Sequence, residues 1–397
     1  MGLSERALSI AGSLTLEIDA RAKQMKAEGK DVVGFGAGEP DFDTPNFIKE
    51  AAKEALDKGM TKYTPASGSL DYKKAICRKL LRDSGLEYQP SQIIISNGAK
   101  HSLFNTFQAI LNPGDEVIIP SPFWLSYPEM VKMADGKPVF VETGEQNGFK
   151  MSAAQFEAAI TPKTKAIVIN SPSNPCGSVY SESELRDIAA IALEKRIFVV
   201  SDEIYEHLIY DGEKAISIAS LGEGIKDLTI IVNGMSKAYA MTGWRLGYTA
   251  SRVDIAKVMG NYQSHATSNP NSIAQHAGMV ALDGPEDAIK AMVKEFDARR
   301  KLMYDTVNSI DNLSCIMPKG AFYIMVNISG VLHKRSNGRK IRGSMDFASS
   351  LLESKNVTVV PGVAFGADNF IRLSYATSRD NIEKGLARIQ EFVKELE

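Results

Sequence analysis

Five short, continuously apolar segments limit most strongly what this chain can fold into. They are rich in β-branched residues and cover residues 92–96, 116–120, 165–170, 196–201 and 228–233. A strand that is apolar at nearly every position, rather than at alternate positions, is typical of a sheet covered on both faces. Helical patterns separate most of these segments, and Ser181 and Glu184 form a capping box at the start of one such helix. The sequence therefore predicts an α/β fold built on a mainly parallel sheet.

Two helical patterns flank this series of strands. Residues 46–59 follow Pro45 and end at Gly59, which are ordinary start and stop signals for a helix. Its expected apolar side consists of Ile48, Ala52, Ala55 and Leu56. Long helical patterns around residues 286–311 are expected to link the α/β part to the last third of the chain.

The last third of the chain has a different pattern. Residues 320–328, 357–361 and 370–376 are expected to form strands, and a closing amphipathic helix shows an apolar stripe of Ile382, Leu386, Ile389 and Val393. A chain of 397 residues is long enough for two substantial cores. We therefore expect a large α/β domain followed by a smaller α+β domain.

Composition excludes several classes of protein. The formal net charge of −2 lacks the basic excess of a general nucleic-acid surface, and no stretch of about 18 apolar residues could span a membrane. The N-terminal residues 1–24 are interrupted by charges and do not resemble a signal peptide. The three cysteines, Cys77, Cys176 and Cys315, are expected to be buried free thiols of a cytoplasmic protein. The five scattered histidines predict no metal site.

Functional residues are expected where the strands end, because open α/β sheets bind ligands beyond the carboxyl ends of their strands. After residues 92–96 comes a small-residue turn that leads into a helix, whose amide groups would suit a phosphate. Trp124 follows the second strand, Asn174 the third and Asp202 the fourth, and the fifth leads to Lys237 with Arg245 nearby. Taken singly, these features have structural explanations: a turn, core packing, a helix cap or a surface charge.

Together, the strand ends match one ligand, pyridoxal phosphate. Its ring needs an aromatic stacking partner, its phosphate a helix N-terminus with an arginine, and its phenolic oxygen hydrogen-bond donors. Its pyridine nitrogen needs a carboxylate that keeps it protonated, and its aldehyde needs a lysine amine for a Schiff base. We therefore expect pyridoxal phosphate as the cofactor.

Six motifs resemble those of the class I, fold-type I pyridoxal-phosphate aminotransferases, and within that class the bacterial and archaeal aspartate aminotransferases. They are GAGEPDFDTP (36–45), KYTPASG (62–68), SPSNPCG (171–177), SDEIYEHLIY (201–210), SKAYAMTGWRLGY (236–248) and IRLSYATS (371–378). The resemblance covers essentially the whole chain. It implies a large domain of residues 46–290 and a discontinuous small domain of residues 1–45 and 291–397.

The same resemblance implies how the cofactor ring is held. Lys237 would form the Schiff base, and Asp202 would pair with the pyridine nitrogen. Tyr205 and Asn174 would donate hydrogen bonds to the phenolic oxygen, and Trp124 would stack on the ring. Lys237 must also act as a neutral amine that moves a proton, although an unperturbed lysine titrates near ~10.4. Positive neighbours and partial burial are expected to lower the pKa of Lys237.

The phosphate is expected to lie at the turn formed by Gly98, Ala99 and Lys100, with Arg245 and Ser236 as further ligands. Tyr63 would reach the phosphate of a neighbouring subunit, which implies a homodimer with shared active sites. One departure from the family pattern is visible: Gly234 stands three residues before the lysine, where the family often has Ser or Thr. That substitution puts one phosphate hydrogen bond in doubt.

The resemblance also implies the substrate contacts. Arg372 would bind the substrate α-carboxylate, because its planar fork suits a carboxylate better than a lysine does. Gly38 would offer a backbone N–H nearby, and Trp124 and Asn174 would line the same pocket. Lys100, Ser13 and Thr15 match positions that surround the distal group in aspartate enzymes.

These roles predict an aminotransferase of the aspartate transaminase type (EC 2.6.1.1). It would move the α-amino group of aspartate to 2-oxoglutarate by a ping-pong mechanism. An aromatic or prephenate aminotransferase is the first alternative, since small pocket changes alter such preferences. A lyase on the same scaffold, such as a C–S lyase, is the second alternative. A non-catalytic regulator that binds pyridoxal phosphate is a further alternative.

Overall fold

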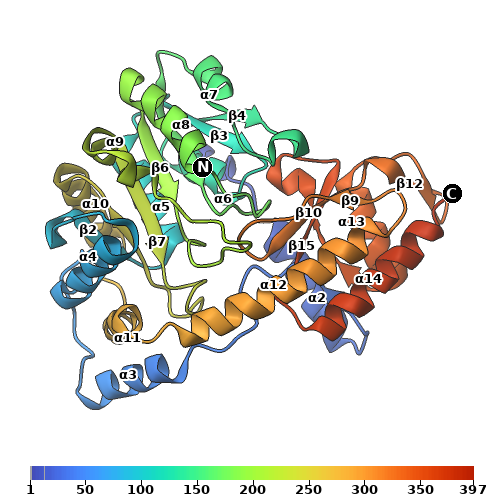
Figure 1. Cartoon of the computed structure of the whole chain (residues 1–397), viewed down its shortest axis with the longest axis horizontal. Coiled ribbons are helices and arrows are strands. Elements are labelled where there is room, and N and C mark those ends of the chain that lie inside the picture. Colours follow the sequence, from blue (N-terminus) through green and yellow to red (C-terminus); the bar gives the residue numbers. More distant parts are fainter. Residues whose placement is uncertain (1, 13) are drawn as a thin grey trace.

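A seven-stranded sheet forms the centre of the larger part of the chain (Figure 1). The computed structural model describes residues 2–12 and 14–397, without the side chains of residues 15, 16 and 19. The strand order is β2-β8-β7-β6-β5-β3-β4, and only β8 runs antiparallel to its neighbours. The strands are β2 (Ile93–Ser96), β3 (Glu116–Ser121), β4 (Lys137–Glu142), β5 (Thr164–Asn170), β6 (Phe198–Asp202), β7 (Thr229–Gly234) and β8 (Gly247–Ala250). The predicted α/β class with a mainly parallel sheet is confirmed.

Helices cover both faces of this sheet, which explains why its central strands are apolar at nearly every position. Alternate residues of one strand enter different cores: Val168 packs with one group of helices, and Ile167 and Ile169 with another. The first group is α5 (Ala99–Ile110), α6 (Ser126–Met133) and α10 (Val253–Ala266). The opposite face is covered by α4 (Leu70–Ser84), α7 (Ala153–Ala159), α8 (Glu182–Lys195), α9 (Glu223–Leu228) and α11 (Ser272–Asp283).

Helix α3 (Asn46–Asp57) lies at the far edge of the molecule, against α11. Ile48, Ala52 and Ala55 are buried as predicted. The prediction for Leu56 is wrong: its side chain is 53% exposed. The buried side of the helix includes Ala51 instead. Ala51 is one helical turn before Ala55, so the buried stripe is displaced toward the Ala51 side of the helix, away from Leu56.

The C-terminal part is built on a four-stranded antiparallel sheet of order β14-β15-β10-β9 (Figure 1). Its strands are β9 (Ser314–Cys315), β10 (Tyr323–Asn327), β14 (Val360–Pro361) and β15 (Phe370–Ser374). Helices α12 (Asp287–Asn308), α13 (Ser344–Lys355) and α14 (Arg379–Lys394) pack on it. The long helix α12 runs from the larger part to this one. A short hairpin, β11 (Arg335–Ser336) and β12 (Arg339–Lys340), lies near the C-terminus.

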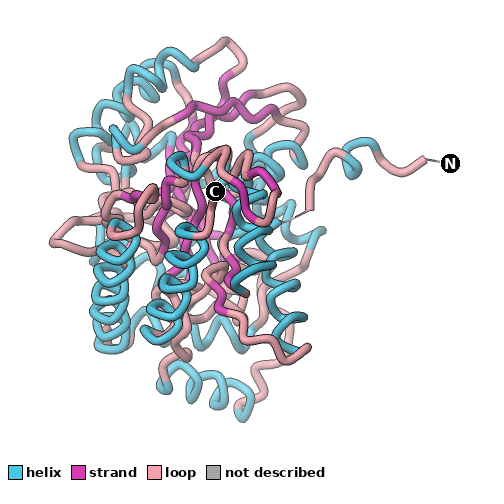
Figure 2. The backbone as a smooth tube through the Cα atoms, turned by 90° about the vertical axis from the view of Figure 1, so that its right-hand side faces the viewer, coloured by secondary structure: helices cyan, strands magenta, loops and turns pink. Residues whose placement is uncertain are grey.

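The N-terminal residues from β1 (Val33–Gly34) onward pack with this C-terminal part, whereas α1 (Glu5–Leu8) contacts α6 of the larger part. Strand β1 pairs in parallel with β13 (Val357–Thr358), and Phe35 belongs to the core beneath α14. Helix α2 (Leu14–Ala27) precedes this strand. Figure 2 shows the N-terminal segment with α1 extending outward, where Arg6 forms an ion pair with Asp135.

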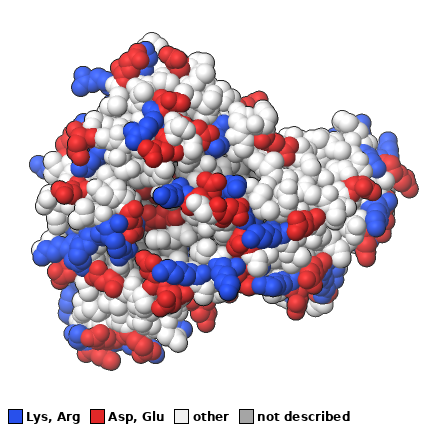
Figure 3. All heavy atoms as spheres, in the orientation of Figure 1, with Lys and Arg blue, Asp and Glu red and all other residues white. Residues whose placement is uncertain are grey.

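Charge is mixed over the part of the surface that one view shows. Acidic and basic side chains are interspersed over the face seen in Figure 3. Across the described ranges, no helix has both the length and the apolarity needed to cross a membrane.

Candidate active site

A cavity of about 550 Å³ lies beyond the carboxyl ends of β5, β6 and β7, where the two parts of the chain meet. Its volume is within the usual range for small-molecule sites. Residues from both parts line it, including most of those predicted from the sequence: Gly38, Ala99, Lys100, Trp124, Asn174, Asp202, Tyr205, Ser236, Lys237, Arg245 and Arg372. Gly98 lies next to this group, at the N-terminus of α5.

Asp202 is the last residue of β6, and its carboxylate is almost fully buried. The hydroxyl of Tyr127 donates to its Oδ2 at 2.6 Å, and the amide of Ile204 donates to its Oδ1 at 3.3 Å. Burial raises the pKa of Asp202 to about 6, while these hydrogen bonds and the Lys237 charge act in the opposite direction. A buried carboxylate with two donors and no directly bound cation is suited to pair with a cationic ligand group.

Lys237 follows β7 in a short turn, and its ammonium donates to the carbonyl oxygen of Gly38 at 2.6 Å. Burial lowers the pKa of Lys237 to about 8, and the positive charges of Arg245 and Arg372 lower it further. Glu39 and Asp202 oppose that change. A lysine with this pKa has a substantial neutral fraction near neutral pH, which a nucleophile or a proton carrier requires.

The N-terminus of α5 forms a tight cradle beside Arg245. Gly98 has φ +87°, and a Cβ there would lie 2.3 Å from Nη2 of Arg245. A Cβ at Gly247, on β8, would lie 2.2 Å from the amide nitrogen of Ala99. Both glycines therefore allow the backbone and the guanidinium to approach each other closely. Free amides at a helix start, together with an exposed arginine that has no carboxylate partner in the described chain, suit a phosphate group.

Arg372, on β15, is buried but lacks an acidic partner among the described residues. Its Nη1 donates to Oδ1 of Asn174 and its Nη2 to the carbonyl oxygen of Gly36, each at 3.0 Å. Its Nε has no hydrogen-bond partner. Burial lowers the pKa of the Arg372 guanidinium. An incompletely paired buried guanidinium is costly unless an anion binds it, so this side chain is arranged for a ligand carboxylate.

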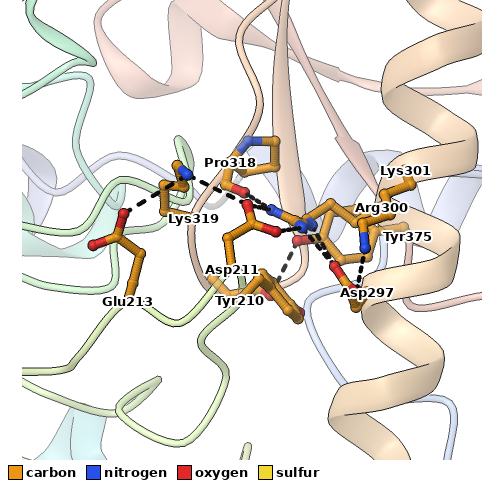
Figure 4. Close-up of polar contacts among 10 residues, drawn as sticks. Tyr210, Asp211, Glu213, Asp297, Arg300, Lys301, Pro318, Lys319 and Tyr375 are labelled. Carbon is orange, nitrogen blue, oxygen red and sulfur yellow. Dashed lines mark hydrogen bonds and ion pairs between the residues drawn. The ribbon is translucent and has the colours of Figure 1, made fainter.

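A second buried arginine shows the contrast. Arg300 of α12 is fully buried, and all five of its N–H groups are used (Figure 4). They donate to the carboxylates of Asp211 and Asp297 and to the carbonyl oxygen of Pro318. Arg300 is therefore a closed structural ion-pair site, whereas Arg372 retains donor capacity in the cavity.

Trp124 and Lys100 lie together at another wall of the cavity. Trp124 is half-buried on the loop before α6, and the ammonium of Lys100 lies 5.0 Å from the centroid of its indole ring. The pKa of Lys100 is lowered, first by burial and then by the charge of Arg245. This arrangement places a flat aromatic surface and a second cation in the same cavity as Arg372.

Tyr63, one of the predicted residues, does not line this cavity. Tyr63 is 89% exposed on the surface. Ser13 lies outside the described residues, and the side chain of Thr15 is likewise not described.

Gly234 ends β7 opposite Gly247, and a Cβ there would lie 2.6 Å from the carbonyl oxygen of Leu246. This close strand contact explains why a glycine, rather than a hydroxyl residue, stands at that position.

The sequence reasoning missed two tyrosines that line the cavity. Tyr127 supports Asp202, and the hydroxyl of Tyr323 lies 3.0 Å from that of Tyr205. In the sequence, the only indication that Tyr127 belongs to the site is its position one helical turn after Trp124. Tyr323 lies in residues 320–328, whose pattern predicts a strand and no function. No group of three or more His, Cys, Asp or Glu in the described part of the chain is arranged to hold a metal ion.

Comparisons with known proteins agree with this site. The family model described as "Aminotransferase class I and II" matches residues 30–389. The chain is 49% identical to an aspartate aminotransferase of Bacillus sp. (strain YM-2), over 99% of both chains. It is 46% identical to an aspartate/prephenate aminotransferase of Cereibacter sphaeroides, over 98% of both. The crystal structure of the Rhizobium meliloti aspartate aminotransferase matches with a TM-score of 0.97 at 45% identity, covering all of both chains. This chain belongs to the class I and II aminotransferases.

Enzymes of this family depend on pyridoxal phosphate, and the chain is a pyridoxal-phosphate-dependent aminotransferase. The residues present fit that cofactor. The cradle at Gly98, Ala99 and Arg245 suits its phosphate, and the buried Asp202 carboxylate suits its protonated ring nitrogen. The amine of Lys237 is in the same cavity, with its pKa already lowered.

Proposed function

We propose that this aminotransferase moves the α-amino group of aspartate to 2-oxoglutarate, as an aspartate transaminase (EC 2.6.1.1). The observation that supports this most directly is Arg372, whose buried guanidinium has an unused Nε–H and no acidic partner in the described chain. An α-carboxylate would supply the missing anion, and both the donor and the acceptor have one. Relatives at 47–49% identity are named aspartate aminotransferase.

The chain's residues divide the work between binding and proton transfer. When bound, pyridoxal phosphate supplies an aldehyde that condenses with amines and a ring that accepts negative charge from the substrate α-carbon. Lys237, neutral for part of the cycle, would take the proton from the substrate α-carbon and deliver it to the carbon on the other side of the amino nitrogen, the former aldehyde carbon of the cofactor. Asp202 stays ionised opposite the ring nitrogen, and Tyr127 holds its carboxylate through the 2.6 Å hydrogen bond.

The second carboxylate of the substrate is proposed to bind near Lys100. The ammonium of Lys100 lies over Trp124 inside the same cavity, at a different wall from Arg372. A dicarboxylate would then contact a cation at each end. A solved aspartate aminotransferase of Thermus thermophilus with maleate, another dicarboxylate, matches this chain with a TM-score of 0.92, at 42% identity over 99% of this chain and 100% of that one.

A second amino acceptor is prephenate. Relatives at 46% and 45% identity are named aspartate/prephenate aminotransferase. Prephenate also has two carboxylates, and it is bulkier than 2-oxoglutarate. The cavity of about 550 Å³ has room for either acceptor.

We also propose a homodimer in which Tyr63 reaches the phosphate site of the partner, which would account for a tyrosine that is 89% exposed. The proposed domains are residues 46–290 and, as one discontinuous unit, residues 1–45 and 291–397. The pairing of β1 with β13 supports that division. A cytoplasmic location fits a chain with three free cysteines.

The test is a coupled assay with purified holoenzyme, in which aspartate is the donor and 2-oxoglutarate, prephenate or no acceptor is supplied. We expect glutamate formation with parallel double-reciprocal lines, as ping-pong kinetics require. A Lys100→Met variant should lose affinity for dicarboxylates more than for alanine as donor. A parallel assay replaces aspartate with a β-thioether amino acid; release of a thiol, pyruvate and ammonia without an acceptor, together with no transfer from aspartate, would contradict the proposal and indicate a lyase.

A further inference from the structure

Tyr323 contacts both Arg372 and Tyr205, two residues that line the cavity. It is fully buried at the start of β10 and lines the cavity. In the ladder between β10 and β15, Tyr323 lies opposite Ser374, and Met325 lies opposite Arg372. Tyr323 and Arg372 are therefore diagonal neighbours on the same face of the sheet. The guanidinium carbon of Arg372 lies 4.3 Å from the centroid of the Tyr323 ring, which is a cation–π contact.

The hydroxyl of Tyr323 has a different partner. It lies 3.0 Å from the hydroxyl of Tyr205, and the two rings meet edge to face at 82°. Both hydroxyls are buried, and neither has another hydrogen-bond partner among the described residues. A pair of phenols has two protons but only one bond between them, so one proton remains for a ligand.

The charges around the pair decide which proton remains. Burial raises the pKa of both tyrosines, while Arg372 lowers it for each and lies directly against the Tyr323 ring. Glu39 raises the pKa of Tyr323, and Asp202 raises the pKa of Tyr205. The Lys237 ammonium lies 6.0 Å from the centroid of the Tyr205 ring. The phenol beside the cation is the stronger donor. With Tyr323 as the donor in the 3.0 Å contact, the proton of Tyr205 would be left for whatever binds in the cavity.

We propose that Tyr323 is a positioning residue for transamination, whose hydroxyl orients the Tyr205 proton toward the bound cofactor while its ring supports Arg372. The proposal rests on the proposed placement of the cofactor beside Tyr205. The ring and the hydroxyl of Tyr323 would then have separate functions. Phenylalanine at position 323 would keep the ring and remove only the hydroxyl.

The test uses holoenzyme and the pH dependence of the visible absorbance of bound pyridoxal phosphate. In Tyr323→Phe, Tyr205 loses its donor and stabilises the phenolic oxygen of the cofactor less well. The apparent pKa of that absorbance should rise by about 0.5–1 unit, the equivalent of one ordinary hydrogen bond. Maleate affinity, measured by calorimetry, should stay within about twofold, because the ring beside Arg372 remains.

Tyr375→Phe is the matched control. Tyr375 is also fully buried, just beyond β15, but its hydroxyl donates to the carbonyl oxygen of Ala321, and it is not one of the residues that line the cavity. This variant should lose stability in thermal unfolding without any change in the absorbance pKa. An equal pKa change in both variants would overturn the proposal, because it would show a general effect of a lost buried hydroxyl.

A double-mutant cycle with Tyr205→Phe completes the test. Tyr205→Phe alone should raise the absorbance pKa, and adding Tyr323→Phe should then change it little, because the two hydroxyls act in series. Additive changes would overturn the proposal, as would a Tyr323→Phe protein with the wild-type pKa. The proposed function fails separately, if wild-type holoenzyme shows no acceptor-dependent transfer from aspartate.

Discussion

The hydroxyl of Tyr127 lies 2.6 Å from Oδ2 of Asp202, and both residues are buried. Tyr127 comes from α6 and Asp202 from the end of β6, so the bond joins a covering helix to the sheet. A hydrogen bond donated to a carboxylate favours its ionised form. Tyr127 therefore opposes the effect of burial, which alone would favour the neutral acid.

Replacing Tyr127 with phenylalanine should weaken cofactor binding. Hydrogen bonds to charged groups contribute about 1.5–3 kcal/mol, so the dissociation constant of pyridoxal phosphate should rise about 10- to 100-fold. Titration of the apo-protein, followed by absorbance, measures it. Tyr180→Phe is the control, because its hydroxyl accepts from the Met151 amide outside the ring site. An unchanged dissociation constant for Tyr127→Phe would contradict this role.

Replacing Arg300 or Arg372 with methionine should have opposite consequences. Arg300→Met leaves Asp211 and Asp297 without their partner, and the protein should be about 3–5 kcal/mol less stable. Arg372→Met removes a charge that has no acidic partner in the described chain, so stability should change little. Its kcat/KM for aspartate should instead fall by about 100-fold or more. Urea unfolding and steady-state kinetics on both variants distinguish the two roles.

The capture of pyridoxal phosphate by the apo-protein should depend on pH through Lys237. The pKa of Lys237 is lowered to about 8, and only the neutral amine attacks an aldehyde. The initial rate should therefore rise about tenfold from pH 6 to pH 7 and level off above pH 8. Stopped-flow absorbance measures it, and pyridoxal, which lacks the phosphate, serves as the control ligand. A rate that is flat from pH 6 to pH 8 would show that Lys237 is not titrating there.

Restoring the hydroxyl residue at position 234 should harm the protein. The Cβ of Gly234→Ser would lie 2.6 Å from the Leu246 carbonyl oxygen, in the strand pair with Gly247. We expect a loss of about 1–3 kcal/mol of stability and no gain in cofactor affinity. Gly260→Ala is the control, since a Cβ there makes only ordinary contacts on a helix. A tighter-binding Gly234→Ser protein would show that the strands can separate at low cost.

The strands that were predictable are those whose burial is complete. Strands β2, β3, β5, β6 and β7 have buried apolar residues on both faces, and the sequence shows that directly. Strand β4 is an edge strand with an exposed Phe140, and β8 is only four residues long and reads GYTA. β8 lacks an apolar run, and the three successive apolar residues of β4 (139–141) lie in a strand with no buried residue, so pairing with neighbours defines both strands.

The part of the site that the sequence predicts is the part where several charged side chains occur in a combination that core packing or turn formation does not explain. A lysine, a carboxylate and an arginine at neighbouring strand ends indicate a cofactor, because buried charges need partners. Tyr127 and Tyr323 could not be identified this way, since buried tyrosines are common in cores. Their importance comes from hydrogen bonds to Asp202 and Tyr205, which depend on how a helix and a second sheet pack against the first.

The cavity is lined by residues from Lys23 near the start of the chain to Arg372 near its end. Contacts between such distant positions form late and slowly, because long loops must close first. A ribosome-bound or C-terminally truncated chain without β15 has no guanidinium at that wall and an open cavity. Binding of maleate, a dicarboxylate expected to need Arg372, would therefore report that a molecule has folded to its last strand.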